Sequence, residues 1–374
     1  MKVLVTDAGY KHALAAIRSL GKKGIYVIAG AHRRGQAFYS KYCRERVIYP
    51  DPADPDKFAE FMIDYVRENR IDVLLPIGYL SCMALSKYLD ELRKCVKIPL
   101  GDYGAMEIAG DKTKTMDFAR TVGVATPKEF RTPDEVDRFP IVVKGNKESG
   151  HITYVNSREE LARVDTSDSV LQEYISGGGY GYYALYNEGI PRAIFMHKRI
   201  REFPATGGAS TAAESYYDPQ LREQGEVLLR ALNWHGVAMV EFKKDNRDGI
   251  YKLMEINPKF WGSLDLSIAC GVDFPYLAVR MAVDGDIEPV EEYRRGLRFR
   301  WPFPDDFKHL LANPKSAGDW LSDFLRKNTR SNLSISDPVP NLYQVANTIR
   351  VVLRLVRKGE LKHPHGRPEM LRDY

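Results

Sequence analysis

Two oxygen-bearing side chains stand two residues apart in the stretch YKLMEINPKFWGS, residues 251–263. In a β-strand, positions i and i+2 point to the same side, so Glu255 and Asn257 are predicted to lie next to each other. Pro258 then ends the strand, because proline lacks the N–H group that a strand ladder uses. The sequence therefore predicts a buried strand that presents a carboxylate and an amide oxygen at one place.

A second carboxylate is predicted to face the first. The run VAMVEFK, residues 237–243, is expected to pair with residues 251–256 in a hairpin, which brings Glu241 opposite Glu255. Two bare carboxylates in this relation repel each other, and a divalent cation removes the repulsion. Two carboxylates and an amide oxygen suit a hard ion such as Mg²⁺. The alternative is that Glu255 and Asn257 sit at a strand end, one solvated and one capping a turn.

A third group of chemistry-bearing residues lies in HKRIREFPATGGASTAAES, residues 197–215. Alternation along a strand puts His197, Arg199 and Arg201 on one face, where they can hold a triphosphate or a carboxylate. Backbone N–H groups of the glycine-rich turn that follows can cradle an anion. The alternative is a solvated charged strand and an ordinary loop. The residues predicted here to contact substrate are His197, Arg201, Gly207, Gly208 and Ser210.

The first part of the chain alternates short apolar runs with helical segments. Strands are predicted at 2–6, 25–29 and 73–76, with helices between and after them. This order indicates βαβ units and a parallel sheet, and we place the domain at residues 1–105. The turn DAGYKHA after the first strand has one glycine where a dinucleotide-binding turn has three. The domain is therefore predicted to be Rossmann-like without the phosphate fingerprint.

The middle of the chain has a different pattern. A helix is predicted over 106–122, strands over 141–144 and 170–175, an antiparallel pair over 182–186 and 193–199, and a helix over 219–232. Together with the hairpin that carries Glu241 and Glu255, these segments predict an α+β domain at 106–300.

The last part, residues 301–374, is predicted to be a mixed, mainly helical extension. Residues 342–356 place apolar side chains at helical spacing and arginines on the other side. We expect this helix to dock on the core through its apolar face, and the rival interpretation is contact with an anionic membrane surface. The apolar positions are Leu342, Val345, Ile349, Val352 and Val356.

Composition narrows the class of protein. The 374 residues are 44% hydrophobic and 28% charged, with a net charge of +5, which is typical of a globular protein and fits an anionic substrate. No apolar run reaches the length of a membrane span. The basic residues are dispersed, which argues against nucleic-acid binding. The four cysteines form no CxxC motif and are expected to be reduced thiols in the cytoplasm.

Five motifs in order resemble the ATP-grasp superfamily of carboxylate–amine ligases. They are GDKTKT at 110–115, VVKG at 142–145, LQEYISG at 171–177, VAMVEFK at 237–243 and MEINPKFWGS at 254–263. The resemblance covers about residues 1–300. It implies a first domain like that of biotin carboxylase and carbamoyl-phosphate synthase, followed by an ATP-grasp domain.

The resemblance also implies roles for particular residues. Lys112 and Lys144 match lysines that contact ATP phosphates, and residues 145–151 match a loop that covers them. The hinge that binds adenine corresponds to Gln172, Glu173, Tyr174 and Ile175. Gly179 stands where the family usually has an acid that binds ribose.

Metal ligation and catalysis are implied in the same way. Glu241, Glu255 and Asn257 match the metal ligands. Lys259 stands where the family often has an arginine that steadies the reacting oxyanion. This departure is expected either to narrow the range of substrates or to shift catalytic duty to Arg199.

These matches lead to a functional hypothesis. The reaction implied is ATP-dependent: a carboxylate attacks the γ-phosphate, and an amine then attacks the acyl phosphate, which gives an amide or peptide-like bond, ADP and phosphate. The cofactors are ATP with Mg²⁺, or Mn²⁺ in its place, and the partners are a small acid and a small amine. A homodimer is left open. The alternatives are an ATP-grasp small-molecule kinase and a non-catalytic ATP-binding sensor.

Overall fold

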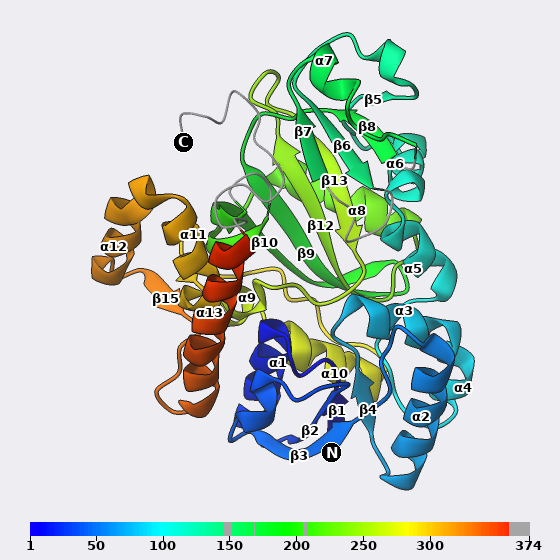
Figure 1. Ribbon diagram of the computed structural model, residues 1–374. Coiled ribbons are helices and arrows are strands. Elements are labelled where there is room, and N and C mark those ends of the chain that lie inside the picture. The colour runs from blue at the N-terminus through cyan, green and yellow to red at the C-terminus, as the bar shows by residue number, and fades with distance from the viewer. Residues whose placement is uncertain (146–151, 168, 205–207, 359–374) are drawn as a thin grey trace.

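The computed structural model describes residues 1–145, 152–167, 169–204 and 208–358 (Figure 1). Within these residues it contains three β-sheets, of four, seven and four strands. In Figure 1 the first sheet lies at the bottom, the two others lie above it in green, and the C-terminal helices stand to one side in orange and red. The predicted class, a parallel-sheet domain followed by an α+β domain and a helical extension, is confirmed.

The first sheet is parallel and has helices on both faces. Val3 and Val5 pack with α1 and α10 on one face, and Leu4 packs with α2 and α3 on the other. Burial on both faces explains why β1, β2 and β4 are apolar at nearly every position, whereas the edge strand β3 carries the exposed residues Arg44, Glu45 and Arg46. The sheet order is β3-β2-β1-β4, with β3 Cys43–Ile48, β2 Tyr26–Ala31, β1 Lys2–Val5 and β4 Val73–Leu75. The helices are α1 Lys11–Lys22, η1 Gln36–Tyr39, α2 Pro55–Glu68, α3 Tyr79–Lys87, α4 Leu89–Arg93 and the late helix α10 Phe274–Asp284.

Two helices lead from the first sheet to a small antiparallel sheet. The sequence predicts one helix over 106–122, and this prediction is wrong: α5 (Tyr103–Gly110) ends and α6 (Lys112–Thr121) begins on either side of Asp111. The backbone of Asp111 is extended, and its Oδ1 accepts a hydrogen bond from the backbone N–H of Lys114 at 2.9 Å, which caps α6. The sheet order is β5-β8-β6-β7, with β5 Glu129–Phe130, β8 Ser169–Glu173, β6 Ile141–Gly145 and β7 Ile152–Val155, accompanied by η2 Pro133–Glu135 and α7 Arg158–Leu161.

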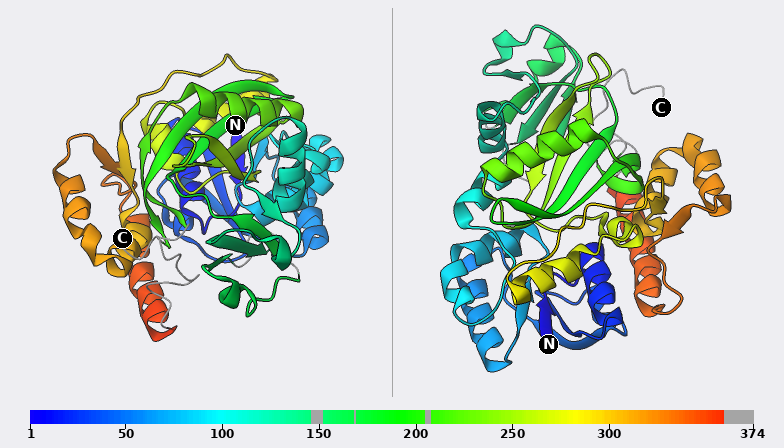
Figure 2. Two further views of the ribbon diagram at one scale, coloured as in Figure 1. Left: turned by 90° about the horizontal axis from the view of Figure 1, so that it is seen from above. Right: turned by 180° about the vertical axis from the view of Figure 1, so that it is seen from behind.

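The large sheet supplies most of the strands. All of its neighbouring strands run antiparallel except β14 and β15. Both predicted pairs are confirmed, β9 with β10 and β12 with β13. Helix α8 (Pro219–Ala231) covers one face, as Figure 2 shows from behind. The order is β13-β12-β9-β10-β11-β14-β15, with β9 Gly179–Asn187, β10 Ile190–Phe203, β11 Ala209–Ser215, β12 Gly236–Lys244, β13 Tyr251–Asn257, β14 Arg298–Arg300 and β15 Thr329–Ser331.

The remaining helices lie after β13 in the chain, and all but the 20-residue α13 are short. They are α9 Leu264–Ala269, η3 Pro302–Asp306, α11 Phe307–Ala312, η4 Pro314–Ser316, α12 Ala317–Leu325 and α13 Val339–Lys358. Ser263 directly precedes α9, and its side chain forms no capping hydrogen bond to that helix. Arg280 pairs with Asp284 at 2.6 Å, and Asp265 accepts a hydrogen bond from the indole of Trp301 at 3.1 Å.

The expected docking of the last helix through its apolar face is wrong. The buried residues of α13 are Pro340, Gln344 and Thr348, whereas Leu342 and Ile349 are exposed by 68% and 60%. Among the helices that the structure describes, none combines the length and the apolar character needed to cross a membrane. Figure 2 (left) shows α13 at the periphery of the molecule, beside the other C-terminal helices.

Candidate active site

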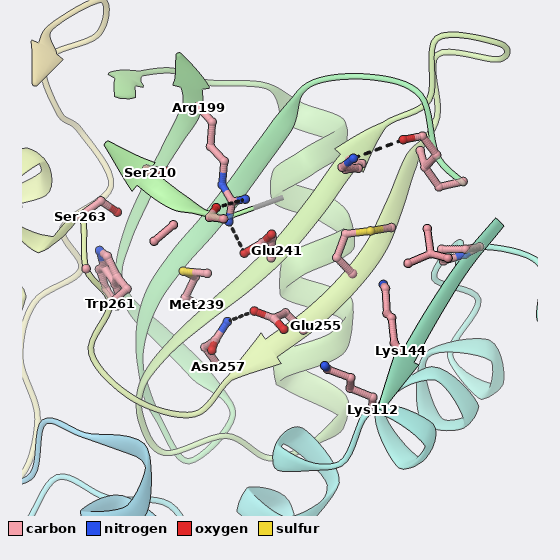
Figure 3. Close-up of a pocket in the computed structure, with 18 of the residues that line it drawn as sticks. Lys112, Lys144, Arg199, Ser210, Met239, Glu241, Glu255, Asn257, Trp261 and Ser263 are labelled. Carbon is pink, nitrogen blue, oxygen red and sulfur yellow. Dashed lines mark hydrogen bonds and ion pairs between the residues drawn. The ribbon is translucent and has the colours of Figure 1, made fainter. Parts of the chain in front are cut away.

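A cavity of about 510 Å³ opens between the small and the large sheet (Figure 3). The large sheet forms its floor through β12 and β13, and β6 and β8 form one wall. The structure brings most of the predicted residues together here: the cavity is lined by Lys112, Lys144, Gln172, Glu173, Tyr174, Ile175, Arg199, Gly208, Ser210, Glu241, Glu255, Asn257 and Lys259.

The two carboxylates meet as the sequence predicts. Glu241 on β12 is directly opposite Glu255 on β13 in the ladder. Their direction follows from alternation, because Val240 and Phe242 are fully buried on the face beneath α8 and Glu241 between them turns to the cavity. Asn257 lies on the same side as Glu255, and its Nδ2 donates a hydrogen bond to Glu255 Oε1 at 2.7 Å.

The electrostatics at this point favour a bound cation. Burial raises the pKa of Glu241 to about 7, partly opposed by Arg199, and the facing Glu255 raises it further. Arg199 forms an ion pair with Glu241, which offsets part of the cost of a buried negative charge there. Half a turn of the Asn257 amide exchanges its nitrogen for its oxygen, which then joins the two carboxylates. This set of oxygens fits Mg²⁺, which takes few protein ligands. The set has only two acidic side chains, since its third member is an amide. Among the residues that the structure describes, no site brings together three or more acidic, His or Cys side chains that could hold a metal ion.

Lysines line the opposite wall. Lys112 is the first residue of α6, and Lys144 lies on β6 with its Nζ donating to Gln172 Oε1 at 2.9 Å. Burial, reinforced by Lys112, lowers the pKa of Lys144 to about 8, and the two carboxylates oppose that shift. Figure 3 shows both lysines on the same side of the cavity, with the amine of Lys112 directed toward Glu255. Cations on one wall and carboxylates on the other are the arrangement expected around a metal-bound polyphosphate.

The far end of the same wall is a narrow apolar slot. Val142, Tyr154 and Met254 contribute side chains, and the rings of Tyr154 and Tyr174 meet edge to face with centroids 5.8 Å apart. The polar side chains of the hinge are already engaged: Gln172 Nε2 donates to Glu129, and Glu173 accepts from the backbone N–H of Lys128 at 2.9 Å. These bonds fix the hinge rather than leave its side chains free, so a planar ring held here contacts backbone and apolar groups.

Known proteins resemble this chain over different parts of its length. The family model described as "ATP-grasp in the biosynthetic pathway with Ter operon" matches residues 165–302. A 5-formaminoimidazole-4-carboxamide-1-(beta)-D-ribofuranosyl 5'-monophosphate synthetase from Pyrobaculum neutrophilum is 29% identical over 186 residues, which are 47% of this chain and 50% of that protein. A 3-methyl-D-ornithine–L-lysine ligase from Methanosarcina barkeri is 25% identical over 180 residues, 47% of this chain and 46% of that protein.

A solved structure extends the likeness beyond the matched residues. The biotin carboxylase domain of 2-oxoglutarate carboxylase from Hydrogenobacter thermophilus, solved with MgADP, ADP and bicarbonate, superposes with a TM-score of 0.63 at 17% identity. The superposition covers 79% of this chain and 73% of that one. Residues 165–302 match an ATP-grasp family, and the chain as a whole has the fold of the solved biotin carboxylase domain. The chain spans about half the length of the two curated relatives named above, so the activity of those whole proteins is not carried over by similarity.

Two residues predicted for the ATP-grasp site lie elsewhere. Arg201 does not share a face with Arg199, because the register of β10 against β11 shifts between these residues; it is buried and paired with Asp306. His197 lies beneath the cavity instead of lining it, and it bonds to Tyr183 and, at 2.7 Å, to Ser263 Oγ. Burial lowers the pKa of His197 to about 3, so it serves as a neutral support for two residues that do line the cavity.

Gly179 is adjacent to the ATP-grasp cavity without lining it. A Cβ atom placed on Gly179 would come within 2.8 Å of Cδ of Arg199. The missing side chain therefore leaves room for Arg199 to cross toward Glu241. Gly207 and residues 146–151 of the expected phosphate-covering loop fall outside the described residues.

Several residues of the cavity were not foreseen. His12, at the start of α1, contributes from the first domain, and its Nδ1 is buried without a hydrogen-bond partner among the residues that the structure describes. Burial, with Lys259 and Lys11, lowers the pKa of His12 to about 3, which keeps the ring neutral. Met239 and Trp261 line the same end, and Figure 3 shows both near Asn257 and Ser263. Met239 stands two residues before Glu241 on β12, and this alternation is a signal in the sequence that could have indicated it. His12 has no such signal, because only the tertiary fold brings it to the cavity.

Proposed function

We propose that this protein is an ATP-dependent carboxylate–amine ligase that forms an amide or peptide-like bond and releases ADP and phosphate. The observation that carries the proposal is the single cavity in which Glu241, Glu255 and Asn257 face Lys112 and Lys144. The names of the two curated relatives, a synthetase and an amino-acid ligase, support the same class of reaction.

The cavity offers a place for each part of ATP. The apolar slot beside Tyr174 and Ile175 takes the adenine ring, and Lys144 and Lys112 bind the phosphates as point charges. Glu241, Glu255 and Asn257 hold Mg²⁺, and Mn²⁺ is suited to the same oxygen ligands. When bound, the cation neutralises charge on the phosphates. The lysines act on the same charge from the opposite wall, which favours transfer of the γ-phosphoryl group.

The remaining end of the cavity fits a carboxylate substrate. Arg199 lies there beside Gly208 and Ser210, and Lys259 lies near Asn257, with Nζ to Oδ1 3.4 Å. A carboxylate oxygen of the acid forms a bond to the γ-phosphorus, and the bond to ADP breaks. The nitrogen of an amine then attacks the acyl carbon, phosphate leaves and the nitrogen loses a proton. We assign Arg199 and Lys259 to stabilising the charge on the oxygen in that second step.

The first test is an ADP-release screen over pairs of small acids and amines, with mass spectrometry of the products. The ligase hypothesis predicts ADP release that requires both substrates and yields a product equal in mass to acid plus amine minus water. A phosphorylated product formed without any amine would identify a kinase instead. Mg²⁺-dependent ATP binding with no ADP in any combination would identify a sensor. Either of these last two results overturns the ligase assignment.

The pH dependence of nucleotide binding tests the role of Lys144. Its pKa of about 8 in the free protein should rise when phosphate binds, since an anion favours the charged amine. At pH values above about 8 the protein should therefore take up a proton on binding ATP and bind it more weakly as the pH rises. Near neutral pH Lys144 is already charged, so the uptake should be small.

Calorimetric titration with ATP in two buffers of different protonation enthalpy measures this uptake. Lys144→Met should remove it and weaken ATP binding by ~10- to 100-fold, the value of a lost hydrogen bond to a charged group. Lys128→Met is the matched control, because Lys128 is a half-exposed lysine whose Nζ pairs with Asp137 at 2.7 Å. Unchanged proton uptake in Lys144→Met would show that another group titrates.

A further inference from the structure

Helix α13 carries polar side chains inward and large apolar side chains outward. Its buried residues are Pro340, Gln344 and Thr348. A helix that faces water on one side has the reverse arrangement, with its apolar side chains against the core. The outward apolar residues, called the outer stripe below, are Leu342, Val345, Ile349, Leu353 and Val356, exposed by 68%, 38%, 60%, 51% and 57%.

Buried polar contacts hold the helix in this orientation. Just before α13, Asp337 accepts hydrogen bonds from Arg18 Nε and Ser40 Oγ, both at 2.8 Å. Within the helix, Gln344 Nε2 donates to Gln36 Oε1 at 2.7 Å. Turning the outer stripe toward the protein would break the bond between Gln344 and Gln36 and expel the buried Gln344 side chain from the core. The buried pair of Arg18 and Asp337 fixes the chain directly before the helix. The outward direction of the stripe is therefore fixed by the fold.

The charge on α13 has one sign. Arg350, Arg354 and Arg357 follow one another at i, i+4 and i+7 and so form a line beside the outer stripe. Residues 339–358 contain no aspartate or glutamate. Two copies of this helix packed stripe to stripe would bring like charges together with no acidic partner from either helix. The charge thus favours an anionic partner over a second copy of the chain.

We propose that α13 binds an anionic lipid surface. The outer stripe enters the boundary between headgroups and acyl chains, and the line of arginines contacts the lipid phosphates. A basic amphipathic helix lies in the plane of the surface in this way. This mode agrees with α13 lacking the combination of length and apolar character needed to cross a membrane. The site for ligation would then operate next to a membrane, at a distance from the helix that holds the protein there.

Sedimentation of the full chain with lipid vesicles tests the proposal. Binding is expected to vesicles that contain phosphatidylglycerol and to be much weaker with phosphatidylcholine alone or at high salt, which screens the arginines. Ile349→Glu with Leu353→Glu should lower the partition coefficient by ~10-fold or more, since a carboxylate is excluded from the acyl region and repelled by the lipid phosphates. Val227→Glu is the matched control, because Val227 is an exposed valine on α8, 38% accessible, far along the chain from the stripe.

A second variant separates the role of charge from that of apolar contact. Arg350→Gln with Arg354→Gln should reduce binding to the anionic vesicles and leave the small binding to phosphatidylcholine unchanged. Absence of vesicle binding would overturn the proposal, as would binding that Ile349→Glu with Leu353→Glu leaves intact. A dimer detected by light scattering that Ile349→Glu with Leu353→Glu dissociates would show instead that the outer stripe binds a second copy of the chain. Vesicle binding that appears only after residues 359–374 are deleted would assign the stripe to that segment.

Discussion

Glu255→Gln should abolish turnover of ATP while the free protein keeps its fold. Glu255 and Glu241 face each other in the ladder, and the amide keeps the shape of the side chain but removes the charge that a divalent cation needs. The rate of ADP release should fall by ~10²- to 10³-fold, the size of effect seen when one charge-stabilising group is lost. A readout that requires neither the acid nor the amine is available as well: Mg²⁺ should no longer strengthen ATP binding in calorimetry.

The same substitution should leave the melting temperature of the free protein unchanged or higher. It relieves the repulsion between facing carboxylates, worth up to about 1 kcal/mol, and a glutamine oxygen still accepts the hydrogen bond from Asn257 Nδ2. Glu223→Gln is the control, since Glu223 is an exposed residue of α8 on the other face of the large sheet. Normal ADP release by Glu255→Gln would refute the assignment of the metal ligands.

The strand-borne part of the site could be predicted because its determinants are local. Alternation over 237–243 and 251–256 indicates which side chains share a face. The exact pairing of Glu241 with Glu255 also depends on a shift of register between Glu241 and Phe242, which the sequence does not reveal. The lysines at 112 and 144 were found through motif order, not through geometry. Lys112 was nevertheless placed inside a continuous helix, because helical periodicity does not show a cap such as Asp111 in advance.

Other features depended on contacts between distant segments. Strict alternation placed Arg201 beside Arg199, but irregular register between β10 and β11 turned it away, and a bulge has no clear signature in one sequence. His12 reaches the cavity only because the first domain packs there. The prediction that the last helix docks on the core through its apolar face failed for a related reason. An apolar stripe indicates that a helix face is covered, but it does not show whether the protein itself or another partner covers it.

The actual surroundings of Arg201 lead to the largest expected effect on stability. Its guanidinium donates to Asp306 Oδ1 and Oδ2 at 2.9 and 3.0 Å and to Asp323 at 2.6 Å, and all three side chains are buried. Arg300, also buried, lies 3.6 Å from Asp306. Asp306→Asn should lower the free energy of unfolding by about 3–5 kcal/mol, because it removes a buried counter-charge shared by Arg201 and Arg300. Denaturation by urea, followed by tryptophan fluorescence, measures the change.

Asp319 provides the matched control, because it reaches the same guanidinium from the rim of the network. Its carboxylate lies 3.3 Å from Arg201 Nη1, but the side chain is 48% exposed. Asp319→Asn should therefore lower the free energy of unfolding by less than about 1 kcal/mol, as is usual for a solvent-screened ion pair. An equal decrease in the free energy of unfolding in Asp306→Asn and Asp319→Asn would show that burial does not determine how much these ion pairs stabilise the fold. The two variants should differ because the fold excludes water from Asp306 and leaves Asp319 in contact with it. Through its buried bonds to Asp306 and Asp323, Arg201 then stabilises the packing of the C-terminal helices against the large sheet.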